Sequence, residues 1–276
     1  MKFAFSILLA MVACAATVHA QAKEPPKEKA SHIADNAYDV VGKTLRPFIG
    51  ALLGGKNVTQ YGMAMRVTIT EVSGRLPAEM AGATVDMAFE YPDKVWVSAP
   101  VLGEKVTICR NGDSIWGTPG KKVELLLSRF PEAKPAPANR KANSPLYLPV
   151  NATEAAFLPA LFSIEKTLET ATLNGDDCRV IAAKMMAPLA EVLKWEGFRT
   201  RVWVAPDYAP RRIEIHQPDF SVTAEISRLK FVPSLPVATW AEPADTADIH
   251  RTKSEMIEAL LYVVFNSLNL KGTTDR

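Results

Sequence analysis

Cysteine and histidine are scarce in this chain, and charge of neither sign dominates it. The 276 residues include three cysteines and four histidines, and 32 basic residues stand against 30 acidic ones. This cysteine content excludes a fold that depends on a framework of disulfides. A net charge of +2 gives no pole of charge that would attract nucleic acid. We therefore expect no nucleic-acid partner.

The sequence also lacks the short motifs by which many enzymes are recognised. It contains no G-x-S-x-G, no Walker loop, no G-x-G-x-x-G and no H-E-x-x-H. Without paired histidines or Cys-x-x-Cys spacing, we expect neither a metal site nor any other cofactor. The carboxylates Asp176 and Asp177 follow Asn174-Gly175, which favours a solvated turn over an acid–base pair. We expect no enzymatic activity, with a hydrolase of scattered catalytic residues as the weaker alternative.

The first twenty residues have the features of a signal peptide. Lys2 precedes an apolar run, and Val18-His19-Ala20 fits a small-x-small cleavage site. Residues 21–32 are polar and typical of a solvated leader. Because Met11-Val12-Ala13-Cys14 resembles a lipobox, a lipid on Cys14 is the alternative. Both alternatives predict an exported protein. Cleavage after Ala20 would leave it periplasmic, and a lipid on Cys14 would anchor it at the envelope.

Cleavage after Ala20 would leave Cys109 and Cys178 as the remaining cysteines. Each lies in a segment that we expect to be a strand. The two thiols could form a disulfide in an oxidising compartment, or they could be small buried strand residues.

Apolar spacing predicts a helix followed by a meander of short strands. Over residues 33–53, apolar residues recur at spacings of three and four positions, which predicts a helix. Pro47 would kink or split this helix, and Gly54-Gly55 would end it. The spacing then changes to two, which predicts half-buried antiparallel strands. These strands cover residues 62–70, 84–91, 94–99, 105–110, 114–119 and 121–127.

The second half of the chain repeats this organisation after a long proline-rich loop at 130–149. We expect a helix over 152–170, which begins at an Asn151–Glu154 cap, and a final helix over about 247–269. Between them the pattern predicts four more strands, with a short helix or loop at 187–198. The strands cover residues 178–185, 199–206, 211–217 and 220–231.

The stretch KVWVSAP at 94–100 is echoed by RVWVAP at 201–206. The flanking segments differ, so we interpret the echo as one device used twice and not as a duplicated domain. Alternation predicts that the valines Val95, Val97, Val202 and Val204 face the helices. Trp96 and Trp203 would then lie on the opposite face of the sheet.

Methionine is unusually common on the predicted apolar face. Met63, Met65 and Met87 lie there with Phe89 and Tyr91. Methionine adapts to irregular apolar shapes, so this face suits either a cavity for lipid tails or ordinary core packing.

Residues 89–126, FEYPDKVWVSAPVLGEKVTICRNGDSIWGTPGKKVELL, resemble the core of the periplasmic lipoprotein-carrier superfamily, the LolA/LolB type. Residues 173–185 and 198–231 are similar to the second half of these proteins, especially to lipoprotein-sorting-like domains of exported proteins. The resemblance covers about residues 60–240. It implies an α+β fold in which a strongly curved antiparallel sheet of about ten strands forms an incomplete barrel, with helices on its concave face.

The resemblance also implies that acyl chains bind between the sheet and the helices, in a single domain over 33–270. The protein would carry acyl chains, lipoproteins or other hydrophobic ligands in the cell envelope, where a membrane-associated partner could exchange them. The alternative is an interaction or sensor module of the same fold without carrier activity. The candidate ligand-binding residues are Met65, Val67, Met87, Phe89, Val95, Val97, Phe157, Leu161, Val222 and Ile226.

The signal-peptide prediction can be tested by the intact mass of the exported protein. We expect a mature chain that begins at Gln21, because Val18-His19-Ala20 precedes it. A chain that begins at Cys14 and carries added acyl mass would instead show a tethered lipoprotein.

Overall fold

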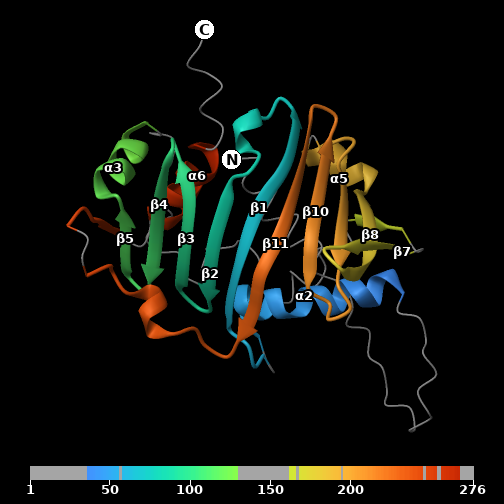
Figure 1. Cartoon of the computed structure of the whole chain (residues 1–276), viewed down its shortest axis with the longest axis horizontal. Helices are drawn as coiled ribbons and strands as arrows, with labels where there is room; N and C mark the ends of the chain where they lie inside the picture. Colours follow the sequence, from blue (N-terminus) through green and yellow to red (C-terminus); the bar gives the residue numbers. More distant parts are fainter. Residues whose placement is uncertain are drawn as a thin grey trace.

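The computed structural model describes most of the chain as one twelve-stranded sheet with helices (Figure 1). The described residues are 36–55, 58–129, 162–165, 168–193, 195–244, 247–253 and 256–267. The strands are β1 (Gly62–Gly74), β2 (Thr84–Glu90), β3 (Lys94–Val101), β4 (Glu104–Asn111), β5 (Ser114–Thr118), β6 (Phe162–Ile164), β7 (Glu169–Leu173), β8 (Asp176–Met185), β9 (Arg199–Val204), β10 (Pro210–Gln217), β11 (Phe220–Val232) and β12 (His250–Lys253). The helices are α2 (Ala37–Leu53), α3 (Gly120–Arg129), α5 (Ala187–Leu193) and α6 (Ile257–Ser267), with short 3-10 turns at Ala78–Met80 and Val237–Trp240.

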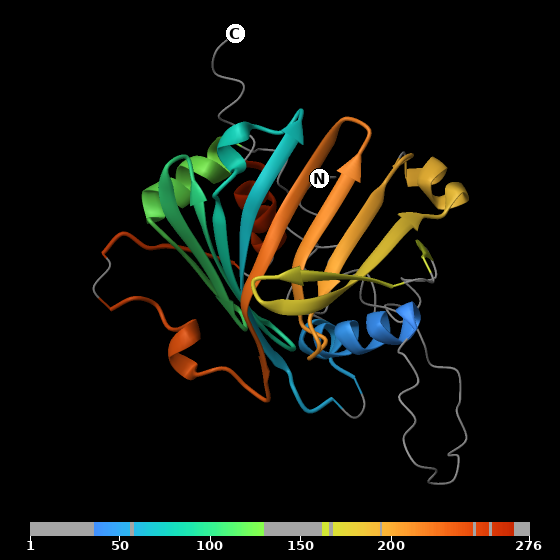
Figure 2. The ribbon, with the colours of Figure 1, turned by 45° about the vertical axis from the view of Figure 1, so that its right-hand side comes forward.

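All strand pairs are antiparallel, and two meanders meet in the middle of the sheet. The order is β12-β5-β4-β3-β2-β1-β11-β10-β9-β8-β6, with β7 paired to β8 beside β6. β1 pairs with β11 almost along its full length and so joins the two meanders. Figure 2 shows a curved sheet whose two ends stay apart. The prediction of an α+β fold with an open, curved antiparallel sheet is confirmed.

One face of this sheet packs against α2 and α6. Side chains from both helices share a single buried cluster with residues of β1, β2, β3, β10 and β11. α2 crosses the lower ends of the central strands in Figure 1, while α6 lies against β3 and β4 near α3. We call this side of the sheet the helix face and the other side the outer face.

Alternation along the strands separates the two faces as the sequence predicts. Val95, Val97, Val202 and Val204 belong to the cluster of the helix face. Trp96 and Trp203 belong to two separate clusters on the outer face. The predicted orientation of the echoed stretches is therefore confirmed.

Three predicted elements are wrong at the edges of the sheet. Residues 121–127, predicted to be a strand, lie in α3, where Val123 and Leu126 are buried three residues apart and Leu125 is exposed. Backbone N–H groups of Lys122 and Val123 bond to the Pro119 carbonyl, so the helix begins directly after the proline. A short apolar run such as Leu125-Leu126-Leu127 fits a buried strand and a short helix equally well, so the sequence pattern could not identify the helix.

The other two errors are predicted helices that contain edge strands. Within 152–170, residues 162–164 form β6 and 169–170 begin β7, both paired with β8. Within 247–269, residues 250–253 form β12 on the edge strand β5, and α6 begins only at Ile257. In each case the free edge of a neighbouring strand supplies hydrogen-bond partners that local spacing cannot reveal. The start of the 152–170 helix lies outside the described residues, as does the loop at 130–149.

Other local predictions agree with the structure. α2 ends at Gly54 as predicted, and the Gly54 N–H bonds to the Gly50 carbonyl, but Pro47 lies inside one continuous helix and does not split it. Asn36 caps its start by accepting a hydrogen bond from the Asp39 N–H. The hairpin at Asn111-Gly112 is present, with Asn111 opposite Ser114, and α5 lies within the predicted 187–198 segment.

On the outer face, cross-strand polar pairs join the central strands. Arg66 of β1 donates two hydrogen bonds to Asp86 of β2, at 2.6 and 2.9 Å. Arg212 of β10 donates one to Glu225 of β11 at 2.7 Å. The hydrogen bonds from Arg66 lower the pKa of the Asp86 carboxyl below its ordinary value.

This lowered pKa predicts an acid-dependent contribution of Asp86 to stability. A carboxyl with a lower pKa in the folded protein stabilises it above the unfolded pKa of about 3.9, and that contribution disappears as pH falls through the folded pKa. We expect Asp86→Asn to lose stability at neutral pH and to change less than the wild type between pH 5 and pH 2. Urea unfolding across this range measures it, with the exposed Asp113→Asn as the control. Equal pH dependence of the wild type and Asp86→Asn would contradict the prediction.

Candidate functional site

The predicted ligand-binding residues of the strands form one continuous wall on the helix face. Eight of the ten are described: Met65, Val67, Met87, Phe89, Val95, Val97, Val222 and Ile226. All eight belong to the same buried cluster and are at most 5% exposed. Phe157 and Leu161 lie outside the described residues.

Strand register arranges this wall in rows that run across the sheet. Met65 lies opposite Met87, which lies opposite Val97 on its other side. Ile226, Val67 and Val85 form a second row across β11, β1 and β2. Such rows place adaptable methionines beside stiff branched side chains, in direct cross-strand contact.

α2 supplies the opposite side of this apolar interior. Its buried side chains include Val40, Val41, Leu45 and Phe48, and the Phe48 ring packs edge-on against Phe231 of β11 at 5.0 Å between centroids. Because the wall residues are so little exposed, a ligand could reach them only if part of the cover over the helix face moved. The interior is therefore closed in this structure.

The two ends of α2 contact the rest of the protein differently. Near its C-terminal end, a Cβ on Gly50 would lie 2.9 Å from Val58, and one on Gly54 would lie 2.8 Å from the Tyr91 ring. Glycine permits these close approaches, and Gly54 also has a positive φ of 66°. Further toward the N-terminus, exposed Lys43 donates a hydrogen bond of 2.9 Å to the Tyr208 hydroxyl. Both halves of the helix are closely packed, because Val40, Val41 and Leu45 of the first half are also buried, and the first half has this polar surface contact in addition.

Thr44 places a hydroxyl on the buried side of α2. Thr44 is 3% exposed, and its Oγ1 has no hydrogen-bond partner among the residues that the structure describes. A threonine in a helix often bonds to the carbonyl four residues earlier, which Thr44 does not do. Burial of an unpartnered hydroxyl is unfavourable by about 1–3 kcal/mol. It therefore adds a polar group to an interior that also contains the buried side chains of Arg110, opposite Val95, and Thr200.

The outer face carries two smaller apolar clusters, each around a tryptophan of the echoed stretches. Trp96 packs against a cluster of Ala88, Cys109, Trp116, Leu235 and Trp240. Trp203 belongs to a cluster of Leu173, Cys178, Val180 and Ala205, and its ring lies between the guanidinium groups of Arg201 and Arg212, at 5.3 and 5.6 Å. These clusters explain why the two strands are apolar on both sides.

Cys109 and Cys178 belong to different outer-face clusters and are free thiols. Burial raises the pKa of Cys109 to about 12 and also raises the pKa of Cys178. Both thiols therefore stay protonated at neutral pH and are poor nucleophiles. The alternatives for these two cysteines were a disulfide and a pair of buried strand residues, and the structure shows buried strand residues.

The described residues include no group of three or more His, Cys, Asp or Glu side chains suited to a metal ion. None of the helices in the described part of the chain is long and apolar enough to cross a membrane.

Structural comparison finds similar solved structures, while no family model and no curated protein sequence matches the chain. The Mycobacterium tuberculosis lipoprotein LppX aligns at 15% identity with a TM-score of 0.41, over 73% of this chain and 97% of LppX. LprF from Mycobacterium bovis aligns at 10% identity with a TM-score of 0.41, over 75% of this chain and 97% of LprF. An outer membrane lipoprotein-sorting protein domain from Vibrio parahaemolyticus aligns at 12% identity with a TM-score of 0.24, over 65% and 88%. A lipoprotein and a lipoprotein-sorting protein domain are thus among the structures that align with this chain.

Sequence reasoning missed Thr44 and the contact between Lys43 and Tyr208. A signal for Thr44 was present, because it lies on the same stripe as Val40, Val41 and Phe48 and is the polar member of that stripe. No signal linked Lys43 to Tyr208, which is 165 residues away in the chain.

The unpartnered hydroxyl leads to a prediction of opposite stability changes at two buried threonines. Thr44→Val removes a desolvated hydroxyl at little change in helix propensity and should stabilise the ligand-free protein by about 1 kcal/mol. Thr200, which is 2% exposed, donates a hydrogen bond of 2.9 Å to the Glu214 carbonyl, so Thr200→Val should destabilise by about 1 kcal/mol. Urea unfolding of both variants measures the two changes. A destabilised Thr44→Val would show that the hydroxyl has a partner in solution.

Proposed function

We propose that this protein is a non-enzymatic carrier of acyl chains, as free lipids or on a lipidated protein, in the cell envelope. The observation that supports it most is the continuous apolar wall on the helix face, built from rows of methionine and branched residues. The signal-peptide pattern of residues 1–20 supports an exported, periplasmic location. A membrane-associated partner would receive or supply the cargo.

In the proposed mechanism the sheet stays fixed and α2 moves. The close packing at Gly50 and Gly54 favours a pivot at the C-terminal end of the helix. The Lys43–Tyr208 contact at the surface is weak enough to break, since an exposed hydrogen bond contributes about 0.5–1.5 kcal/mol. Swinging the first half of α2 outward would open the interior near the turn between β9 and β10.

The free energies limit which ligands can open the site. Release of Val40, Val41 and Leu45 would expose three apolar side chains, at a cost of roughly 5–9 kcal/mol. A 16-carbon chain that replaces them regains about 12 kcal/mol at ~0.8 kcal/mol per CH₂, before ordering costs. A six-carbon chain regains only about 5 kcal/mol by the same measure. The site should therefore select long chains.

We expect the delipidated protein to bind fluorescent fatty acids of about 14–18 carbons and to show little binding at about six carbons. Met87→Gln keeps the length of the side chain but puts an amide in the wall, so it should weaken binding at least tenfold. The matched control is Thr84→Gln on the outer face of the same strand, which should bind as the wild type does. Circular dichroism verifies that both variants are folded.

Mass spectrometry of organic extracts identifies the natural cargo in protein purified without detergent. Absence of acyl binding at every chain length would contradict the carrier proposal. If a membrane protein co-purified in that case, the fold would serve as an interaction module instead.

A further inference from the structure

Three basic side chains lie side by side on the outer face, across β8, β9 and β10. Lys184 of β8 is opposite Arg199 of β9, and Arg199 is opposite His216 of β10. All three residues are exposed. Arg199 lies on the same side of its strand as Trp203, four residues later, so these side chains belong to the outer face. We call Lys184, Arg199 and His216 the basic row.

Hydroxyl groups continue this row on the strands at both sides. Ser163 of β6 lies opposite Lys184, and Ser221 of β11 lies opposite His216. The Ser221 hydroxyl shares a hydrogen bond of 2.7 Å with the hydroxyl of Ser73 on β1. Six adjacent strands thus place in one line side chains that can all donate hydrogen bonds, and the line contains no carboxylate.

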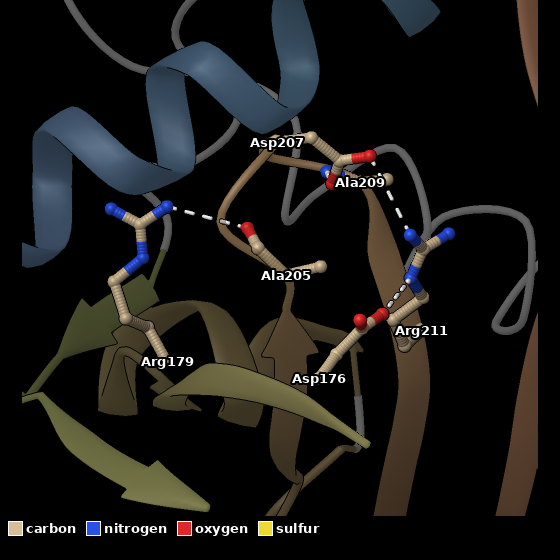
Figure 3. Close-up of polar contacts among 6 residues, drawn as sticks. All are labelled: Asp176, Arg179, Ala205, Asp207, Ala209 and Arg211. Carbon is tan, nitrogen blue, oxygen red and sulfur yellow. Dashed lines mark hydrogen bonds and ion pairs between the residues drawn. The ribbon is translucent and has the colours of Figure 1, made fainter. Parts of the chain in front are cut away.

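Cations elsewhere on the same strands are compensated by carboxylates. Arg212 of β10 lies opposite Glu225 of β11 and donates a hydrogen bond of 2.7 Å to it. Near the start of β10, Arg211 lies between Asp176 at 3.2 Å and Asp207 at 3.5 Å (Figure 3). The basic row differs from these arrangements, because its cross-strand neighbours have charge of the same sign.

Lys184 and Arg199 form no ion pair within the part of the chain that the structure describes. The carboxylates that flank the row are Glu214, which lies 3.7 Å from His216, and Glu165, which follows β6. Like charges directly opposite each other destabilise a sheet, so the placement of Lys184 opposite Arg199 is unfavourable for the protein alone. An anion beside both cations would be attracted by each and would remove this repulsion.

An exposed apolar side chain lies next to the basic row. Met186, two residues after Lys184, is 46% exposed. A soluble anion makes no use of such a side chain, whereas the interface of a bilayer accommodates apolar side chains beside Lys and Arg. The combination therefore favours a bilayer surface that contains anionic lipids.

We propose that the basic row docks the protein on a bilayer surface of anionic phospholipids. Lys184 and Arg199 would bond to headgroup phosphates, His216 would donate a further hydrogen bond, and Met186 would enter the headgroup region. This inference rests on the proposed carrier function and names the surface that supplies or receives the cargo. Docking through the outer face would leave α2, on the helix face, outside the contact.

Flotation with lipid vesicles measures this docking. At low salt, we expect the wild type to bind vesicles of equimolar phosphatidylcholine and phosphatidylglycerol at least about tenfold tighter than vesicles of phosphatidylcholine alone. Each cation removed should weaken this binding roughly fivefold, because one Lys or Arg near an anionic surface contributes about 1 kcal/mol. The double variant Lys184→Gln, Arg199→Gln should therefore lose roughly 25-fold. Met186→Gln should weaken binding as well, because it removes the apolar contact.

The matched control is the double variant Lys105→Gln, Lys253→Gln. These two lysines are exposed on β4 and β12, toward the other edge of the sheet, and neither forms an ion pair with a described residue. The control removes the same net charge and should bind anionic vesicles within about twofold of the wild type, since charges beyond a Debye length are screened. An equal loss in the control would show that overall charge, and not the basic row, attracts the vesicles. Urea unfolding should find the row variant at least as stable as the wild type, because it removes opposed like charges.

The outcomes separate docking from the carrier proposal. Equal binding of the wild type to neutral and anionic vesicles would overturn the docking row, and retained binding of a fluorescent fatty acid would then leave the carrier proposal standing. The row variant should bind this fatty acid as the wild type does, because its substitutions lie on the outer face. A preference for anionic vesicles without any acyl binding would overturn the carrier proposal and keep the row as a membrane site.

Discussion

The pairing of β1 with β11 is the interaction on which the rest of the structure depends. It joins residues 62–74 to 220–232 and so connects the meander β1–β5 to the meander β8–β11. Without it, each meander would expose an apolar face of its own. The register shifts between Ala64 and Arg66 and between Ile69 and Glu71, and such irregularities increase the local twist and bend of a strand. The same pairing therefore makes the sheet continuous and contributes to its curvature.

A continuous apolar face needs a cover, and the nature of this cover decides what the protein can do. A helix that crosses the strands, as α2 does, buries side chains of β1, β2 and β11 at once. It can do so with few covalent or polar links, since apolar burial has no preferred direction. A long acyl chain offers the sheet the same kind of contact. Under the carrier proposal, helix and ligand would therefore exchange places without a large net change in buried apolar area.

The centre of the fold could be predicted from the sequence, and its edges could not. Strands such as 84–91 alternate because one face is buried and the other carries pairs such as Arg66–Asp86, and that alternation is visible in the sequence. At the edges, β6 and β12 are strands because β8 and β5 offer unpaired backbone groups, which no local pattern records. For the candidate site, the wall residues follow from alternation alone. The contacts of Lys43 and Arg179 with the Tyr208 ring do not, because these three residues meet only through the tertiary fold.

The outer face explains why the sheet, and not the helix, should be the fixed part of a carrier. The buried carboxylate of Glu90 accepts hydrogen bonds from Lys94 and from the Leu235 N–H, both at 2.6 Å, and so holds the segment after β11 against β2 and β3. The Trp240 carbonyl accepts hydrogen bonds from Trp116 and Cys109 in the same cluster.

Around Trp203, Arg201 and Arg212 lie against the ring from β9 and β10. Each echoed stretch thus has valines toward the helix face and a tryptophan anchored on the outer face. Strands held by side chains on both sides resist bending more than strands packed on one side. Under the carrier proposal, movement that admits a ligand is therefore expected in α2, against a wall that keeps its shape.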